Sequence, residues 1–143
     1  MNRQDQLANQ VVTHMMEQDA FSQWLGIKVL EVKEGYSKIE MLIRKEMVNG
    51  FGIVHGGITF SLADSAFAFA CNNRNNLSVA LDTSITFTKA VQVGDTITAE
   101  AKEAHNGRST GLYHITISNQ KKEMVAHFKG TCFRTGKPLI SPR

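Results

Sequence analysis

The chain has 143 residues, the length of one domain, and its 42% hydrophobic content is ordinary for a folded globular protein. No apolar run reaches the roughly 20 residues that span a membrane, and the polar start Met1 to Gln6 lacks a signal-peptide core, so we expect a cytoplasmic protein away from membranes. The net charge is +3, but no run of consecutive Lys and Arg residues is longer than Lys121-Lys122, which disfavours nucleic acid as a partner. The positive charge then indicates either an ordinary solvated surface or the binding of a small phosphorylated ligand.

The N-terminal segment, residues 1–25, is predicted to be helical. Apolar side chains recur there at helical spacing and predict a helix over residues 4–18, with Gln and Glu on its other face: Leu7, Ala8, Val11, Val12, Met15 and Met16. Asp19 can cap a short second helix that holds Trp24 and ends at Gly26. We expect these apolar side chains to pack rather than to bind a cofactor.

From Ile27 the hydrophobic period changes from helical to alternating. Two strands are predicted on either side of the turn Glu34-Gly35, and the four asparagines between Asn72 and Asn76 predict a loop. Four further strands are predicted from alternation and from the turns between them: residues 77–91, 96–104, 111–118 and 124–133. The tail over residues 136–143 is expected to fray.

The helix between the two groups of strands is the most apolar segment of the chain. It is predicted to run from Gly57 to Cys71, about 22 Å at the usual helical rise, and its lack of a polar face requires it to be enclosed. Consecutive strands with short turns form an antiparallel sheet. We therefore predict a single α+β domain over residues 1–143, with one long central helix wrapped by a curved antiparallel sheet of about six strands and an N-terminal helix.

The start of this helix carries the residues that indicate chemistry. The sequence His55-Gly56-Gly57 places free backbone N–H groups at the helix N-terminus, where they can hold an anion or a polarised carbonyl. Asp64 is a single carboxylate among Leu, Ala and Phe, and a buried unpaired carboxylate is costly. An acid together with an oxyanion cradle is the minimum equipment for acyl transfer.

No metal site is predicted. Cys71 and Cys132 match no metal-ligand or redox spacing, and we expect both thiols to be reduced and buried. The histidines outside the glycine-rich turn form no ligand cluster: His14, His105, His114 and His127.

The order of elements and the Asn49, His55-Gly56-Gly57 and Asp64 signature resemble the hot-dog fold, and more narrowly the phenylacetate-degradation (PaaI-like) branch of the acyl-CoA thioesterases. The spacing agrees with that signature, because His55 follows Asn49 by 6 residues and Asp64 follows His55 by 9. The resemblance covers most of the chain. It implies hydrolysis of an acyl-CoA, perhaps of aryl or phenylacetyl type, to the free acid and CoA, with no cofactor because coenzyme A is part of the substrate.

The resemblance also implies how the site is assembled. Active sites of the family form across a subunit interface, so the Gly56 N–H of one chain would polarise the thioester carbonyl while Asp64 of the other attacks it or activates water. Asn49 would hold that water or orient its loop, and His55 would hydrogen-bond near the sulfur or support the loop. At least a homodimer, and often a tetramer built as a dimer of dimers, is implied.

Substrate-binding residues are predicted more loosely. Gly57 belongs to the cradle, and the acyl pocket is expected to draw on Phe51, Phe60, Leu62 and Phe67. Thr83 and Ser84 are expected to contact the acyl part. The cations expected to meet the CoA phosphates are Lys89, Arg108 and Lys129.

Other interpretations remain open at this point. His55 and the glycines can serve only to shape a turn, and Asp64 can be a surface residue if Ser61 and Ser65 form a polar stripe facing water. The alternative functions are a hot-dog hydratase or dehydratase, whose His and carboxylate pattern we do not find here, and a non-catalytic acyl-CoA binding protein, which would have no need of the acid.

Overall fold

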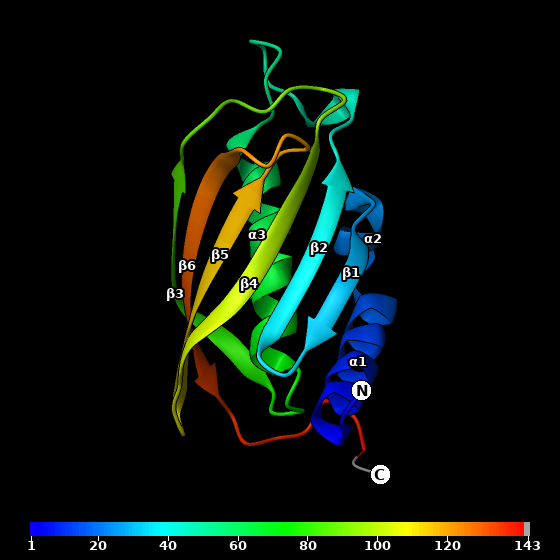
Figure 1. Cartoon of the computed structure of the whole chain (residues 1–143), viewed down its shortest axis with the longest axis vertical. Coiled ribbons are helices and arrows are strands. Elements are labelled where there is room, and N and C mark those ends of the chain that lie inside the picture. Colours follow the sequence, from blue (N-terminus) through cyan, green and yellow to red (C-terminus); the bar gives the residue numbers. More distant parts are fainter. Residues whose placement is uncertain (142–143) are drawn as a thin grey trace.

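A computed structural model describes residues 1–141 as six antiparallel strands and three α-helices (Figure 1). The elements are α1 (Arg3–Gln18), α2 (Ala20–Leu25), β1 (Lys28–Lys33), β2 (Tyr36–Leu42), the short 3₁₀ turn η1 (Lys45–Met47), α3 (Gly56–Asn72), β3 (Ser78–Phe87), β4 (Thr96–Asn106), β5 (Thr110–Ser118) and β6 (Met124–Arg134). The strand order is β1-β2-β4-β5-β6-β3. This is the hot-dog arrangement that the sequence predicts.

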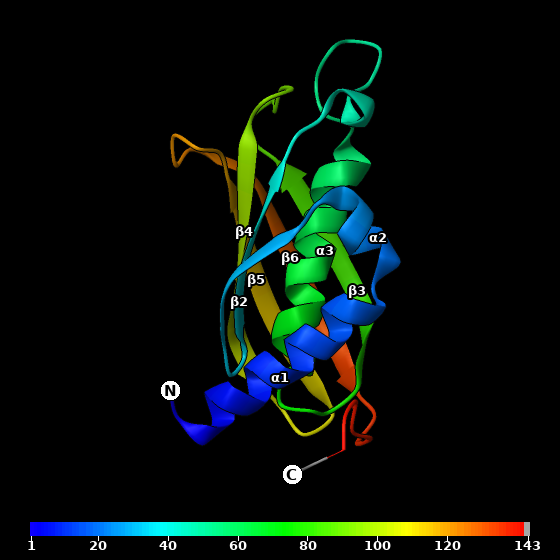
Figure 2. The same ribbon diagram turned by 90° about the vertical axis from the view of Figure 1, so that its right-hand side faces the viewer.

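The N-terminal segment folds as expected and lies against the same side of the sheet as α3 (Figure 2). Asn2 caps α1 by accepting a hydrogen bond from Asp5 N at 2.8 Å, and Asp19 caps α2 by accepting one from Ser22 N at 2.9 Å. Gly26 ends α2 in the left-handed conformation, with φ 78°, which glycine adopts without strain. α1 packs against β1 and α3, and α2 meets α3 through Ser22 and Ser65.

α3 packs its apolar side chains onto the concave face of the sheet. Leu62, Ala66 and Phe67 are fully buried, and the Phe67 ring meets those of Tyr113 and Phe128 at 5.8 Å between centroids. Gly130 on β6 lets this ring approach, because a Cβ there would lie 2.8 Å from Phe67. The helix is therefore fixed in position along the sheet.

The curved sheet wraps one side of the helix, and part of the opposite side stays open in a single chain. Gly57, Ser61, Asp64 and Ala68 remain partly or fully exposed and, at helical spacing, form one stripe along α3. Ser65 lies beside this stripe and is covered by α2, through its hydroxyl contact with Ser22 at 2.8 Å. A single chain therefore leaves one side of its central helix open.

The asparagines predicted to mark a loop tie the far end of α3 to its surroundings. Asn73 is buried; its Oδ1 accepts from Gly35 N in the β1–β2 turn and its Nδ2 donates to the carbonyl of Lys33 at the end of β1, both at 2.9 Å. Asn75 accepts hydrogen bonds from the N–H groups of Leu139 and Ile140. The expectation of a frayed tail is therefore wrong for residues 136–140, whereas residues 142 and 143 lie outside the described part.

β3 is shorter than predicted and forms an edge of the sheet. It ends at Phe87 rather than near residue 91, and it pairs with β6 alone. Two of its apolar side chains are largely exposed to solvent: Val79 is 50% and Leu81 is 59% exposed. No helix within residues 1–141 is long and apolar enough to cross a membrane.

Candidate active site

The glycine-rich turn ends at the N-terminus of α3, and His55 is the capping residue there. Its Nδ1 accepts a hydrogen bond from Gly57 N at 3.3 Å, which assigns the ring proton to Nε2 when the ring is neutral. Gly56 is the first residue of the helix, and its N–H donates to no group within residues 1–141. The positive end of the helix dipole thus presents one free amide, as the oxyanion cradle requires.

Because His55 caps the helix, its loss is expected to cost stability. His55→Ala should lower the free energy of unfolding by about 1 kcal/mol, whereas His55→Asn should retain most of it, since Asn is a good capping residue. Denaturant unfolding of the two variants beside the wild type measures this difference. Equal stabilities of all three proteins would show that the cap contributes nothing.

A cavity of about 500 Å³ opens beside the free amide of Gly56. Its walls come from the loop before α3, from the first turn of α3, from the segment after β3 and from β6: Asn49, Ile53, Val54, Gly56, Thr59, Phe87, Thr88, Lys89, Ala90, Val91 and Val125. The Phe87 ring stands against Gly56, and a Cβ at that position would lie 3.1 Å from its Cζ. A side chain at position 56 would therefore crowd this end of the cavity.

Asn49 shapes the loop that forms one wall. Its Oδ1 accepts hydrogen bonds from Phe51 N at 2.8 Å and Ile53 N at 3.4 Å, an arrangement typical of Asn in turns. Its Nδ2 donates to no group within the described range, so it is available to a ligand or a water in the cavity. The geometry is compatible with both roles expected for Asn49.

Asp64 is half-buried on the open stripe of α3. Its pKa is raised, first by loss of hydration and second by the negative charge of Asp19 at the start of α2. Asp19 is held there by Ser22, whose hydroxyl donates to its Oδ2 at 2.5 Å and contacts that of Ser65 at 2.8 Å. The carboxyl group is neither fully enclosed nor a free surface residue.

Within one chain, Asp64 and Gly56 do not form one site. They are eight residues apart on the same helix, a separation of about 12 Å along its axis. The free amide and the carboxylate can act on one thioester only if each is met by the complementary group of another chain.

The four residues expected to line the acyl pocket between subunits lie in different surroundings within a single chain. Phe51 lies at the tip of its loop and is 90% exposed. Leu62 and Phe67 are core residues, and Phe60 packs edge-on against Phe128 with 5.3 Å between ring centroids. None of the four lines the cavity beside Gly56 in a single chain.

Thr83 and Ser84 point to opposite faces of the sheet. Residues paired across β3 and β6 point to the same face of the sheet. Thr83 is paired with Gly130, where a Cβ would meet the Phe67 ring on the helix side, whereas Ser84 is paired with Lys129 on the outer face. The structure therefore brings Thr83 to the side of α3 but not Ser84.

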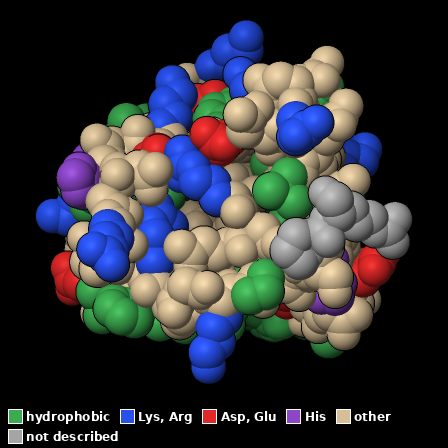
Figure 3. All heavy atoms as spheres, turned by 90° about the horizontal axis from the view of Figure 1, so that it is seen from below, with side chains coloured by type: hydrophobic (Ala, Val, Ile, Leu, Met, Phe, Trp, Pro, Cys, Tyr) green, Lys and Arg blue, Asp and Glu red, His purple; other side chains and the backbone are tan. Residues whose placement is uncertain are grey.

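The three predicted phosphate-binding cations are also separated. Lys89 lines the cavity and pairs with Glu123 at 3.0 Å. Arg108 lies in the β4–β5 turn, near the end of α3 remote from Gly56, and Lys129 lies on the outer face of the sheet. Figure 3 shows the molecule from below, relative to Figure 1, and on this face the Lys and Arg side chains are scattered among acidic and apolar ones.

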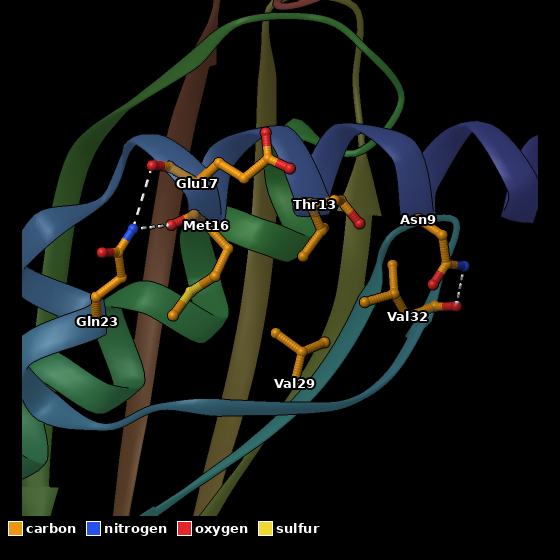
Figure 4. A pocket seen from close by; sticks show the side chains of 8 residues that line it. Asn9, Thr13, Met16, Glu17, Gln23, Val29 and Val32 are labelled. Carbon is orange, nitrogen blue, oxygen red and sulfur yellow. Dashed lines mark hydrogen bonds between the residues drawn. The ribbon is translucent and has the colours of Figure 1, made fainter.

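Three further hollows lie apart from this cavity, one of them, of about 600 Å³, between Gln10 and His14 of α1 and residues 139–141. A second, of about 320 Å³, is lined by His55, Gly57 and Ser61 of the helix start and by Phe21 of α2. The third, of about 360 Å³, lies between α1 and β1, where Gln23 donates to the carbonyls of Met16 and Glu17 at one end (Figure 4). It contains none of the predicted site residues.

Sequence reasoning missed several residues of the site. Thr59 and Val125 line the cavity, and Asp19 acts on Asp64, although all three lie in segments whose secondary structure was predicted. The polar Thr59, one turn after the glycines on an apolar helix, was the available signal. Within the described residues, no group of three or more His, Cys, Asp or Glu side chains could hold a metal ion.

Comparisons with known proteins identify the family of this chain. The sequence profile of the Thioesterase superfamily matches residues 51–126. The chain is 43% identical to the acyl-coenzyme A thioesterase PaaI of Escherichia coli K12 over 122 residues, which are 85% of this chain and 87% of that protein.

Solved structures give the same result. The E. coli PaaI protein of the phenylacetic acid degradation operon has a TM-score of 0.92 and 40% identity, covering 94% of this chain and 97% of its own. The Streptococcus mutans UA159 protein smu.793, solved bound to acetyl CoA, has a TM-score of 0.76 and 28% identity, covering 78% and 90%. The chain therefore belongs to the thioesterase superfamily.

Proposed function

We propose that this protein is an acyl-CoA thioesterase, which hydrolyses the thioester of an acyl-CoA to the free acid and CoA. The observation that carries the proposal is the unpartnered Gly56 amide at the N-terminus of α3, beside a cavity and on the same helix as Asp64. The similarity to E. coli PaaI over most of both chains supports the same activity, and the acetyl CoA bound to smu.793 supports CoA thioesters as the substrate class.

In the proposed mechanism, the Gly56 N–H donates to the thioester oxygen and stabilises the negative charge that develops there. Asp64 of the partner chain can attack the carbonyl carbon, which expels the CoA thiolate and leaves an anhydride that water then hydrolyses. Alternatively it takes a proton from a water that attacks the same carbon and expels the thiolate. Asn49 orients the loop and can hold the water through its Nδ2. Lys89 at the cavity wall is the best placed of the expected cations for the CoA phosphates.

The same proposal requires at least a homodimer. It is supported by the open stripe of α3 that carries Asp64 and by the exposed apolar side chains Val79 and Leu81 on the edge strand β3, which is free to pair with a second chain. A monomer found by light scattering at micromolar concentration would contradict this assembly. The tetramer, the phenylacetate pathway and the cytoplasmic location stay predictions.

The pH profile is expected to report the ionisation of Asp64. Because the active form is the carboxylate and its pKa is raised, kcat/KM should fall on acidification through that raised pKa. Asp19→Asn removes a like charge while retaining a capping side chain, so the acid limb should move to lower pH. Measurements of kcat/KM from pH 4 to 8 determine this shift. Asp5→Asn is the matched control, and its kcat/KM should fall at the same pH as that of the wild type.

The function is tested by thiol release from a panel of CoA thioesters: short-chain, long-chain, benzoyl, phenylacetyl and hydroxylated phenylacetyl. The ranking of kcat/KM values also defines the acyl group that the pocket accepts. An enoyl-CoA should be followed in parallel by its conjugated absorbance. Hydration of the enoyl-CoA without thiol release, or tight binding without turnover in calorimetry, would replace the hydrolase by one of the alternative functions.

A further inference from the structure

Thr59, in the first turn of α3, carries a hydroxyl group that the fold leaves without a partner. The residue is 1% exposed, and its Oγ1 makes no hydrogen bond with any group within residues 1–141. Buried hydroxyls normally have partners, because an unpaired one gives up the hydrogen bonds that water offers it in the unfolded chain. In the part of the chain that the structure describes, no other buried side-chain nitrogen or oxygen is left unpaired.

This side chain belongs to the cavity beside Gly56. The walls around it are mainly apolar, with Val54, Phe87 and Val125 among them, and these side chains offer no hydrogen-bond partner. Threonine in a helix divides between two χ1 rotamers, so a rotation of about 120° carries its hydroxyl group to a second staggered position. An apolar cavity with a few polar groups that fix orientation is the usual form of a small-molecule site.

The position of Thr59 defines which part of the substrate it meets. It follows Gly56 by three residues, about 4.5 Å along the helix axis. A thioester whose carbonyl oxygen accepts from the Gly56 N–H would place the acyl carbons one or two bonds beyond the carbonyl beside Thr59. An oxygen attached there would lie within hydrogen-bond reach of the free hydroxyl.

We propose that Thr59 is a specificity-determining residue that selects acyl groups with an oxygen on carbon 3, that is, 3-hydroxyacyl thioesters over the unsubstituted chains of equal length. The inference rests on the proposed hydrolase function. A hydrogen bond to the substituent satisfies the hydroxyl that no group of residues 1–141 pairs, whereas an unsubstituted chain does not.

The test compares 3-hydroxybutanoyl-CoA with butanoyl-CoA in the wild type, in Thr59→Val and in Thr59→Ser. The wild type should prefer the hydroxylated substrate in kcat/KM. Thr59→Val, which has nearly the same shape, should reduce the ratio of the two kcat/KM values by about five- to tenfold, the size expected for one neutral hydrogen bond. Thr59→Ser retains the hydroxyl and should keep the ratio.

A second measurement is independent of the substrate. Because no group within residues 1–141 pairs with the hydroxyl, Thr59→Val should leave the Tm unchanged or raise it. A marked fall in Tm would show that the hydroxyl is already paired within the fold, and it would overturn the inference.

The kinetic outcomes separate this inference from the proposed function. A wild type that cleaves both substrates equally, prefers butanoyl-CoA, or cleaves other thioesters but neither of these two overturns the role of Thr59. An unchanged ratio in Thr59→Val does the same. A wild type that cleaves no CoA thioester at all contradicts the hydrolase function itself.

Discussion

Replacing Asp64 by Asn is expected to lower kcat/KM for any accepted acyl-CoA by about 10²–10⁴-fold, the range for removal of a catalytic acid or base. Asn has the same shape but neither attacks a thioester nor accepts a proton from water at neutral pH. Among the described residues, Asp64 is the only one proposed to attack the thioester or to activate the water. Thiol release under substrate saturation and at low substrate separates the loss in kcat from any change in KM.

The stability of this variant provides the control. The pKa of Asp64 is raised in the folded state, so the folded protein binds the proton more tightly than the unfolded chain does, and ionisation destabilises the fold at neutral pH. Asp64→Asn removes that penalty, and its Tm should equal or exceed that of the wild type. Full activity in a well-folded Asp64→Asn protein would show that another group does the chemistry.

Replacing Gly56 by Pro is expected to lower kcat by about 10²–10³-fold, the usual effect of losing one oxyanion donor. Proline has no N–H, yet the first position of a helix accepts it. The preceding residue, His55, has φ −67° and ψ 131°, which is the conformation that a following proline favours. The substitution therefore removes the donor while the helix is retained, as circular dichroism can check.

Gly56→Ala is the matched control for this variant. It keeps the N–H but adds the same Cβ, which would lie 3.1 Å from the Phe87 ring and requires that exposed ring to shift slightly. The alanine variant should retain much more activity than the proline variant. Equal losses in both would attribute the effect to crowding by the side chain and not to the amide.

The sequence predicted the fold well because its signals are local. Alternating strands, capped helices and a glycine-rich turn each report on a few consecutive residues, and these elements appear where expected. The strand after Asn76 was predicted too long, because Thr88 and Val91 are residue types that favour strands, whereas residues 88–91 leave the sheet and line the cavity. The C-terminal tail was predicted to fray because its hydrogen-bond partners, the Asn75 side chain and the Leu77 backbone, are about 60 residues away in sequence.

The site was predictable only in part, for a similar reason. His55, Gly56 and Asp64 share one helix, so their spacing carried the signal. Phe60 and Phe67 share that helix too, but the face on which they lie is set by packing against β6, which no local pattern reveals. The influence of Asp19 on Asp64 depends on how α2 lies against α3, a tertiary contact between segments 45 residues apart.

Subunit mixing tests whether each active site combines the Gly56 amide of one chain with Asp64 of another. Asp64→Asn and Gly56→Pro proteins are unfolded together, refolded together and assayed for thiol release, with mixed dimers verified by mass spectrometry. Each mixed dimer would contain one site with neither substitution, so random pairing predicts recovery of about a quarter of the wild-type activity. Mixed dimers that form but remain as inactive as the two parent variants would show that Gly56 and Asp64 of different chains do not share one active site.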